Sequence, residues 1–74
     1  MDDELGNRLR VERARRDLTQ QALADLVGVS RKTINTVETG RFVPSTLLAL
    51  RMARALGVRV EDLFFLGDGS AARG

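Results

Sequence analysis

Apolar residues recur at helical spacing over most of this chain, and the pattern predicts helices separated by short turns. The clearest pattern covers residues 20–27, whose apolar stripe consists of Leu23, Ala24, Leu26 and Val27. Thr19 can cap this helix, because its hydroxyl accepts a hydrogen bond from a first-turn backbone N–H. Gly28 can end it, since glycine enters the left-handed conformation without a side-chain clash.

A second helix is predicted immediately after this turn. Ser30 is its N-cap, and Ile34 and Val37 lie three residues apart on one side of residues 30–38. Two helices joined by a turn of about three or four residues with a glycine form a helix-turn-helix unit. Residues 20–40 therefore predict this unit, with residues 30–38 as its second helix.

The flanking segments predict three more helices and an all-α domain over residues 1–66. The first helix covers residues 3–16, with Leu5 and Leu9 inward, Glu12 next in register and Val11 able to share the packing. The fourth covers residues 46–56, with Ser45 as its cap and Gly57 as its end, and its inward side chains are Leu48, Ala49, Met52, Ala53 and Leu56. A short fifth helix covers residues 60–65. Residues 67–74 lack apolar periodicity and predict a flexible C-terminal tail.

The polar side of residues 30–38 carries side chains that suit nucleic acid. At about 100° per residue, one arc of this helix holds Arg31, Lys32, Asn35, Thr36 and Thr39. Arginine and lysine reach the acceptors of guanine, asparagine pairs with adenine, and threonine adapts to several partners. The arc has no acidic residue, unlike most solvated helix faces, which combine both charges. On these residues alone, DNA contact and a solvated face are equally well supported.

Charge and composition narrow the functional classes. Residues 8–59 carry eleven basic and four acidic residues, a net of +7, and every basic residue except Lys32 is arginine. Such a block suits a polyanion, although a high-GC coding sequence also enriches arginine. Because the chain has no cysteine and no histidine, we expect no enzyme, no metal site and no cofactor. Without a long apolar run or a signal-like start, we expect a cytoplasmic protein with no membrane contact.

The run from Thr19 to Gly40 resembles the XRE/Cro type of helix-turn-helix, the phage-repressor-like family of transcriptional regulators. The matching positions are Gln20, Ala24, Gly28, Ile34, Val37, Glu38, Gly40 and Pro44, followed by the LGV at residues 56–58. The match covers about residues 5–65 and departs at Glu12, where the family usually has an aliphatic residue. The resemblance implies a compact five-helix bundle of the phage-repressor DNA-binding type, which inserts residues 30–38 in the major groove of double-stranded DNA.

The resemblance also implies roles for individual residues. Base edges are contacted by Arg31, Lys32, Asn35 and Thr36, with Thr33 on the flank and with Gln20 and Arg41 on phosphates. Arg41 could instead be only a cation at a helix C-terminus. Arg13 and Glu38 form a structural pair that ties the first helix to the third.

Apolar residues beyond the predicted core indicate a partner surface. Those at its edge are Leu47, Leu50, Phe65 and Leu66, and they predict a homodimer on a palindromic operator, unless they only complete the core. By family analogy the output is repression. The alternatives are an antitoxin or another regulator that binds a different protein, and a general DNA-coating protein without sequence preference.

Overall fold

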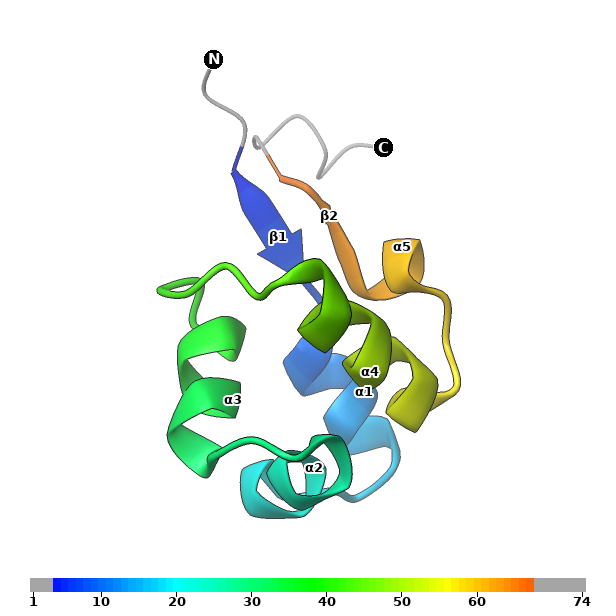
Figure 1. Ribbon diagram of the computed structural model, residues 1–74. Helices are drawn as coiled ribbons and strands as arrows, with labels where there is room; N and C mark the ends of the chain where they lie inside the picture. The colour runs from blue at the N-terminus through cyan, green and yellow to red at the C-terminus, as the bar shows by residue number, and fades with distance from the viewer. Residues whose placement is uncertain (1–3, 68–74) are drawn as a thin grey trace.

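The computed structural model describes residues 4–67, and within that range five helices form most of the fold (Figure 1). In chain order they are α1 (Leu9–Arg15), α2 (Gln20–Val27), α3 (Arg31–Glu38), α4 (Thr46–Leu56) and α5 (Val60–Leu63). Two short strands, β1 (Leu5–Asn7) and β2 (Phe64–Leu66), pair as an antiparallel sheet. The predicted five-helix bundle is confirmed, and the small sheet is an addition that the all-α prediction did not include. None of the described helices has the length and apolar character needed to cross a bilayer.

The predicted capping residues of α2, α3 and α4 occupy their expected places. The hydroxyls of Thr19, Ser30 and Ser45 each accept the backbone N–H of the residue three positions later, at 3.0–3.1 Å. Gly28 and Gly57 end α2 and α4 with φ of 79° and 71°, a conformation that favours glycine. The boundaries of these three helices are therefore set by local interactions that the sequence displays.

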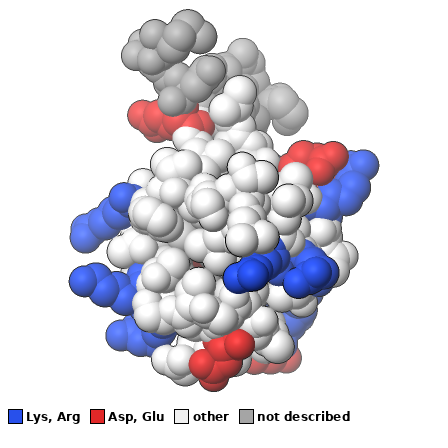
Figure 2. Space-filling model, in the orientation of Figure 1, with Lys and Arg blue, Asp and Glu red and all other residues white. Residues whose placement is uncertain are grey.

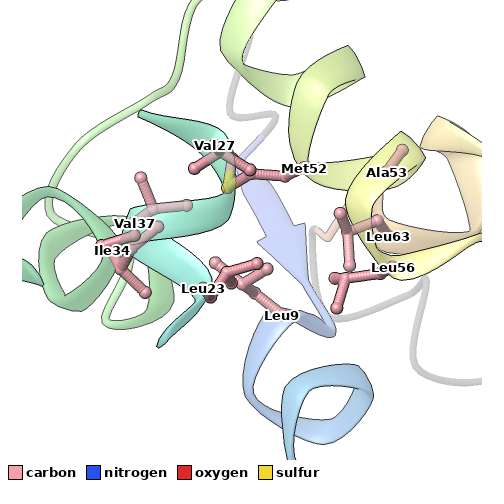
Figure 3. Packing of buried hydrophobic residues seen from close by; sticks show 10 residues of the cluster. Leu9, Leu23, Val27, Ile34, Val37, Met52, Ala53, Leu56 and Leu63 are labelled. Atoms are coloured by element: carbon pink, nitrogen blue, oxygen red, sulfur yellow. The ribbon is translucent and has the colours of Figure 1, made fainter. Parts of the chain in front are cut away.

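One core joins all five helices (Figure 3). It consists of Leu9 from α1, Leu23, Ala24 and Val27 from α2, Ile34 and Val37 from α3, Met52, Ala53 and Leu56 from α4, and Leu63 from α5. Leu26 is an exception to the predicted stripe of α2, because its side chain is 61% exposed. Ile34 and Val37 are almost fully buried, so α3 is held against the core along one side only.

The first and fifth helices are shorter than predicted. Residues 5–7 are a strand rather than the start of a helix, with Leu5 opposite Leu66 and Asn7 opposite Phe64. The backbone N–H of Arg8 donates to the carbonyl of Leu63 (2.9 Å), which continues this pairing up to α1. The prediction of a helix over residues 3–16 was wrong for its first turns, because pairing with a distant strand satisfies the same backbone groups.

The inward position of α1 that follows Leu9 belongs to Glu12. Glu12 is buried, and its carboxylate accepts hydrogen bonds from Arg16 (2.8 Å) and Arg15 (3.3 Å). Val11 is 49% exposed, so the expectation that Val11 shares this packing was wrong. A carboxylate can occupy this position because two guanidinium groups offset the cost of its burial.

The segment predicted as a tail lies mostly outside the described residues. Gly67 is the exception, since its N–H donates to the carbonyl of Glu4 (2.6 Å) and extends the strand pairing by one step. The rest of the predicted tail, residues 68–74, is not described.

The contact between Gly6 and Phe65 can be tested by mutation. A Cβ atom on Gly6 would overlap the ring of Phe65, so Gly6→Ala should displace the ring and lower the free energy of unfolding by about 1–3 kcal/mol. Urea denaturation followed by circular dichroism measures this change. In a Phe65→Ala background the same substitution should cost much less. An equal cost in both backgrounds would contradict the assigned contact.

Candidate nucleic-acid interface

The outward side of α3 gathers most of the residues predicted to contact DNA. A shallow depression is lined by Arg31, Lys32, Asn35, Thr36, Thr39 and Arg41. Arg31 and Lys32 are exposed at the beginning of the helix, whereas Asn35 and Thr36 are half-buried further along it. Thr33 is half-buried and lines an adjoining depression with Lys32 and Arg41. The structure therefore brings three basic residues, the amide and two threonines onto one surface.

The loop after α3 returns to this helix and carries Arg41 with it. Gly40 turns the chain with φ of 78°. The backbone N–H groups of Arg41 and Phe42 then both donate to the carbonyl of Thr36, at 2.9 and 3.1 Å. Arg41 is exposed beside the last turn of α3, so its cation extends the polar surface of the helix.

Two threonine hydroxyls of this surface donate to the helix itself. Thr36 Oγ1 donates to the carbonyl of Thr33, and Thr39 Oγ1 donates to the carbonyl of Asn35, both at 2.9 Å. In this arrangement each hydroxyl oxygen is an acceptor toward the outside, and each side chain also has a methyl group. Together with the donors of Arg31, Lys32 and Arg41, the surface offers the range of contacts that base edges require.

The charge on this side of the molecule is positive. Figure 2 shows Lys and Arg side chains projecting on the side where α3 lies in Figure 1, with no Asp or Glu side chain visible among them. Phosphate groups are attracted to such a surface, and each neutralised phosphate makes binding more sensitive to salt.

A buried ion pair lies at the end of α3, between this helix and α1. Arg13 Nε is 2.6 Å from Glu38 Oε2, and Arg13 Nη2 donates to Oε1 at 3.3 Å. The carboxylate of Glu38 is 0% exposed, and the side chain of Arg13 is 16% exposed. Arg13 also donates to the carbonyl of Leu18 (2.7 Å), in the link that leads to α2. The pair therefore joins α1, the α1–α2 link and the end of α3.

Glu38 remains a carboxylate in this site despite its burial. Burial raises its pKa, but hydrogen bonds from Arg13 and Gln20 and the charges of Arg13 and Arg10 lower it by more. The net result is a pKa below the ordinary value of glutamate. Near neutral pH the group is therefore ionised and accepts hydrogen bonds only.

Gln20 connects this ion pair to the polar side of α3. Its Nε2 donates to Glu38 Oε1 (3.0 Å), and its Oε1 accepts from Arg31 Nη1 (3.3 Å). The sequence predicted Gln20 as a phosphate contact, and its position at the first turn of α2 is compatible with that role. The structure adds two intramolecular bonds that the sequence did not indicate.

Asn7 is a residue of this region that sequence reasoning missed. Its Oδ1 accepts the N–H of Leu9 (3.0 Å), the first residue of α1, and its Nδ2 donates to the carbonyl of Val37 (3.1 Å) in the last turn of α3. An asparagine two residues before an apolar helix is a local signal for the bond to Leu9, because asparagine side chains bond the backbone two residues on. No local signal exists for the contact with α3.

The four residues predicted as a dimer interface differ in exposure. Leu47, Leu50 and Leu66 are 59%, 50% and 63% exposed. Phe65 is half-buried over Gly6, and the guanidinium of Arg8 lies 4.4 Å from the centre of its ring. Three of the four are therefore available to a partner, whereas Phe65 mainly makes contacts within the subunit.

A family model and a relative that match this chain are both described as helix-turn-helix proteins. Residues 4–64 match the model of a family described as a helix-turn-helix domain. An uncharacterized HTH-type transcriptional regulator of Methanocaldococcus jannaschii is 45% identical over 62 residues, which are 84% of this chain and 94% of that protein.

Two solved structures share the fold. The restriction-modification controller protein C.AhdI of Aeromonas hydrophila has a TM-score of 0.71 at 34% identity, over 74% of this chain and 83% of its own. The P22 c2 repressor protein, solved with a synthetic operator, has a TM-score of 0.71 at 30% identity, over 73% of this chain and 82% of its own.

The ion pair predicts a specific dependence of stability on pH. Because the pKa of Glu38 is lowered in the folded state, its stabilisation is present above the pKa of an unfolded glutamate, about 4.3, and is lost as the pH falls through the lowered value. Glu38→Gln should lower the free energy of unfolding by up to about 3 kcal/mol near pH 7, and this difference from wild type should shrink below pH 4.3. Urea titrations at a series of pH values measure it.

A control for this experiment is Glu61→Gln, since the side chain of Glu61 is 63% exposed. Its stability should follow that of wild type over the whole pH range. If the Glu38→Gln difference were constant down to the acid limit of the fold, Glu38 would not have the lowered pKa.

Proposed function

This chain belongs to the helix-turn-helix family of transcriptional regulators, of the XRE/Cro type, and we propose that it binds a palindromic operator as a homodimer and represses transcription there. Proteins of this family are DNA-binding regulators and not enzymes. The observation that carries the proposal is the surface of α3, where cationic and amide side chains face outward while Ile34 and Val37 are buried behind them.

In the proposed complex, α3 lies in the major groove. Arg31, Lys32, Asn35 and Thr36 contact base edges there, because they line one depression and include donors, acceptors and methyl groups. Thr33 lies on the flank of this surface. Arg41 and Gln20 contact the phosphates on either side, and the free N–H groups at the start of α2 assist Gln20.

The proposed homodimer uses the exposed apolar residues of α4 and β2. Leu47, Leu50 and Leu66 each expose half or more of their side chains, which is unfavourable on a small domain unless a partner covers them. A two-fold dimer would place two copies of α3 about 34 Å apart, one turn of DNA. Binding at such a site would obstruct polymerase, and this is the basis for proposing repression.

A second candidate is a regulator whose partner is a different protein. Leu26 is 61% exposed and lines a shallow depression with Asp25, Arg51 and Arg54, between α2 and α4. The two cations outnumber the one carboxylate there, and an apolar side chain in such a surface suits a partner with a net negative charge. This reading leaves the DNA-binding role of α3 unchanged.

Selection of bound duplexes from a random pool tests the DNA-binding proposal. We expect a palindrome whose half-site centres lie about 10 bp apart. Arg31→Ala should weaken binding to this site by about 1–3 kcal/mol and relax the preference at one base pair per half-site, as measured by fluorescence anisotropy at fixed salt.

The control for charge is Arg59→Ala, which removes the same charge from a side chain at the start of α5 that is 75% exposed and whose acidic partners are exposed as well. It should leave the base preference unchanged. If Arg31→Ala weakened binding to every sequence equally, Arg31 would be a phosphate contact instead.

Sedimentation equilibrium tests the proposed dimer. Leu50→Glu should raise the dissociation constant of the dimer at least tenfold, because a carboxylate would be buried at an apolar contact. Val11→Glu is the matched control, since Val11 on α1 is 49% exposed and Leu50 is 50% exposed, and it should have little effect. A wild-type protein that is monomeric at tens of micromolar, with and without operator, would favour the second candidate.

A further inference from the structure

We propose that Gln20 positions Arg31 for a guanine and that the buried carboxylate of Glu38 decides which way the Gln20 amide faces. This inference rests on the proposed role of α3 in contacting bases, and it concerns how one of those contacts acquires its specificity. The residues involved come from three helices and are joined by hydrogen bonds in the order Arg13, Glu38, Gln20, Arg31.

The chemistry of the two neighbours determines the orientation of the Gln20 amide. Glu38 is a carboxylate and accepts only, so the NH₂ group of Gln20 faces it, with Nε2 3.0 Å from Glu38 Oε1. The amide oxygen is then turned toward Arg31, whose Nη1 donates to it at 3.3 Å. The reversed amide would place oxygen against oxygen on one side and N–H against N–H on the other. Both neighbours therefore favour the same orientation.

Glu38 is itself held firmly in place. Its carboxylate is 0% exposed and pairs with Arg13 at 2.6 Å, while Arg13 also donates to the carbonyl of Leu18. Gln20 is the first residue of α2, immediately after the N-cap Thr19. The backbone of Gln20 is thus held by the capped start of α2, and its amide is held by the buried carboxylate of Glu38.

The consequence for recognition lies in the side chain of Arg31. Arg31 is exposed, and a free arginine side chain loses conformational entropy when it is ordered on a base. One hydrogen bond to Gln20 restricts the guanidinium in advance and leaves its other N–H donors for the N7 and O6 acceptors of guanine. The preference for guanine would therefore depend on Glu38, which is buried and does not reach the DNA.

Two substitutions interrupt this chain of contacts at different points. Gln20→Met keeps the length of the side chain and removes both hydrogen bonds, whereas Glu38→Gln replaces the acceptor by an amide that no longer selects one orientation of Gln20. Each should reduce the preference for guanine at the Arg31 base pair about two- to tenfold, the effect of one hydrogen bond. In an Arg31→Ala background, neither should change the preference at that base pair further.

Glu12→Gln is the matched control for the loss of a buried ion pair. Glu12 is a buried carboxylate of α1 that pairs with Arg16 at 2.8 Å, and it makes no contact in this chain of hydrogen bonds. The substitution should lower stability and leave base preference unchanged. If Glu38→Gln does not fold, Gln20→Met decides the question, because Gln20 is only half-buried.

The outcomes separate this inference from the proposed function. A wild-type protein that binds all duplexes equally would overturn the proposed function itself. A sequence-specific wild type whose Gln20→Met and Glu38→Gln variants bind every duplex more weakly, with an unchanged preference for guanine, would overturn this inference and make Gln20 a phosphate contact only.

A measurement without DNA provides an independent test. The NMR order parameter of the Arg31 Nε–H group should fall in Gln20→Met and in Glu38→Gln, but not in Glu12→Gln. Equal order parameters in all four proteins would show that Gln20 does not restrict Arg31 in the free protein and would overturn the inference.

Discussion

The ion pair between Arg13 and Glu38 is the interaction on which the position of α3 depends. A carboxylate at the last residue of a helix is unfavourable, because the negative end of the helix dipole lies there. Burial adds a desolvation cost. Both costs are offset by Arg13, Gln20 and the nearby Arg10. If α3 turned about its axis, the carboxylate would lose these partners while still buried, so the pair selects one orientation of the helix.

The remaining contacts of α3 leave its outward side free for the proposed contact with DNA. Ser30 caps its beginning, Ile34 and Val37 pack into the core, and Asn7 donates to the carbonyl of Val37 at its end. Threonine and asparagine are weak helix formers, and α3 has only eight residues. Its stability therefore comes from neighbouring elements rather than from its outward residues. Those residues can consequently suit a particular base sequence at little cost to the fold.

The parts of this structure that could be predicted from the sequence are those determined within a few residues. The caps at Thr19, Ser30 and Ser45 and the buried stripe of α4 are of this kind. The pairing of β1 with β2 could not be predicted, because Leu5 and Leu9 are spaced as on a helix and the partner strand lies near the other end of the chain. The two bonds of Gln20 were missed for the same reason, since they depend on how α2 and α3 pack.

The small sheet connects the proposed dimer surface with the proposed DNA surface. Leu66 lies at the end of β2 and is exposed, β2 pairs with β1, and Asn7 at the end of β1 donates to the carbonyl of Val37 in α3. In the proposed dimer, this path contains only backbone pairing and one side-chain bond, and both resist displacement more than a flexible linker does. The sheet would therefore help to hold the two recognition helices at the spacing that a palindromic site requires.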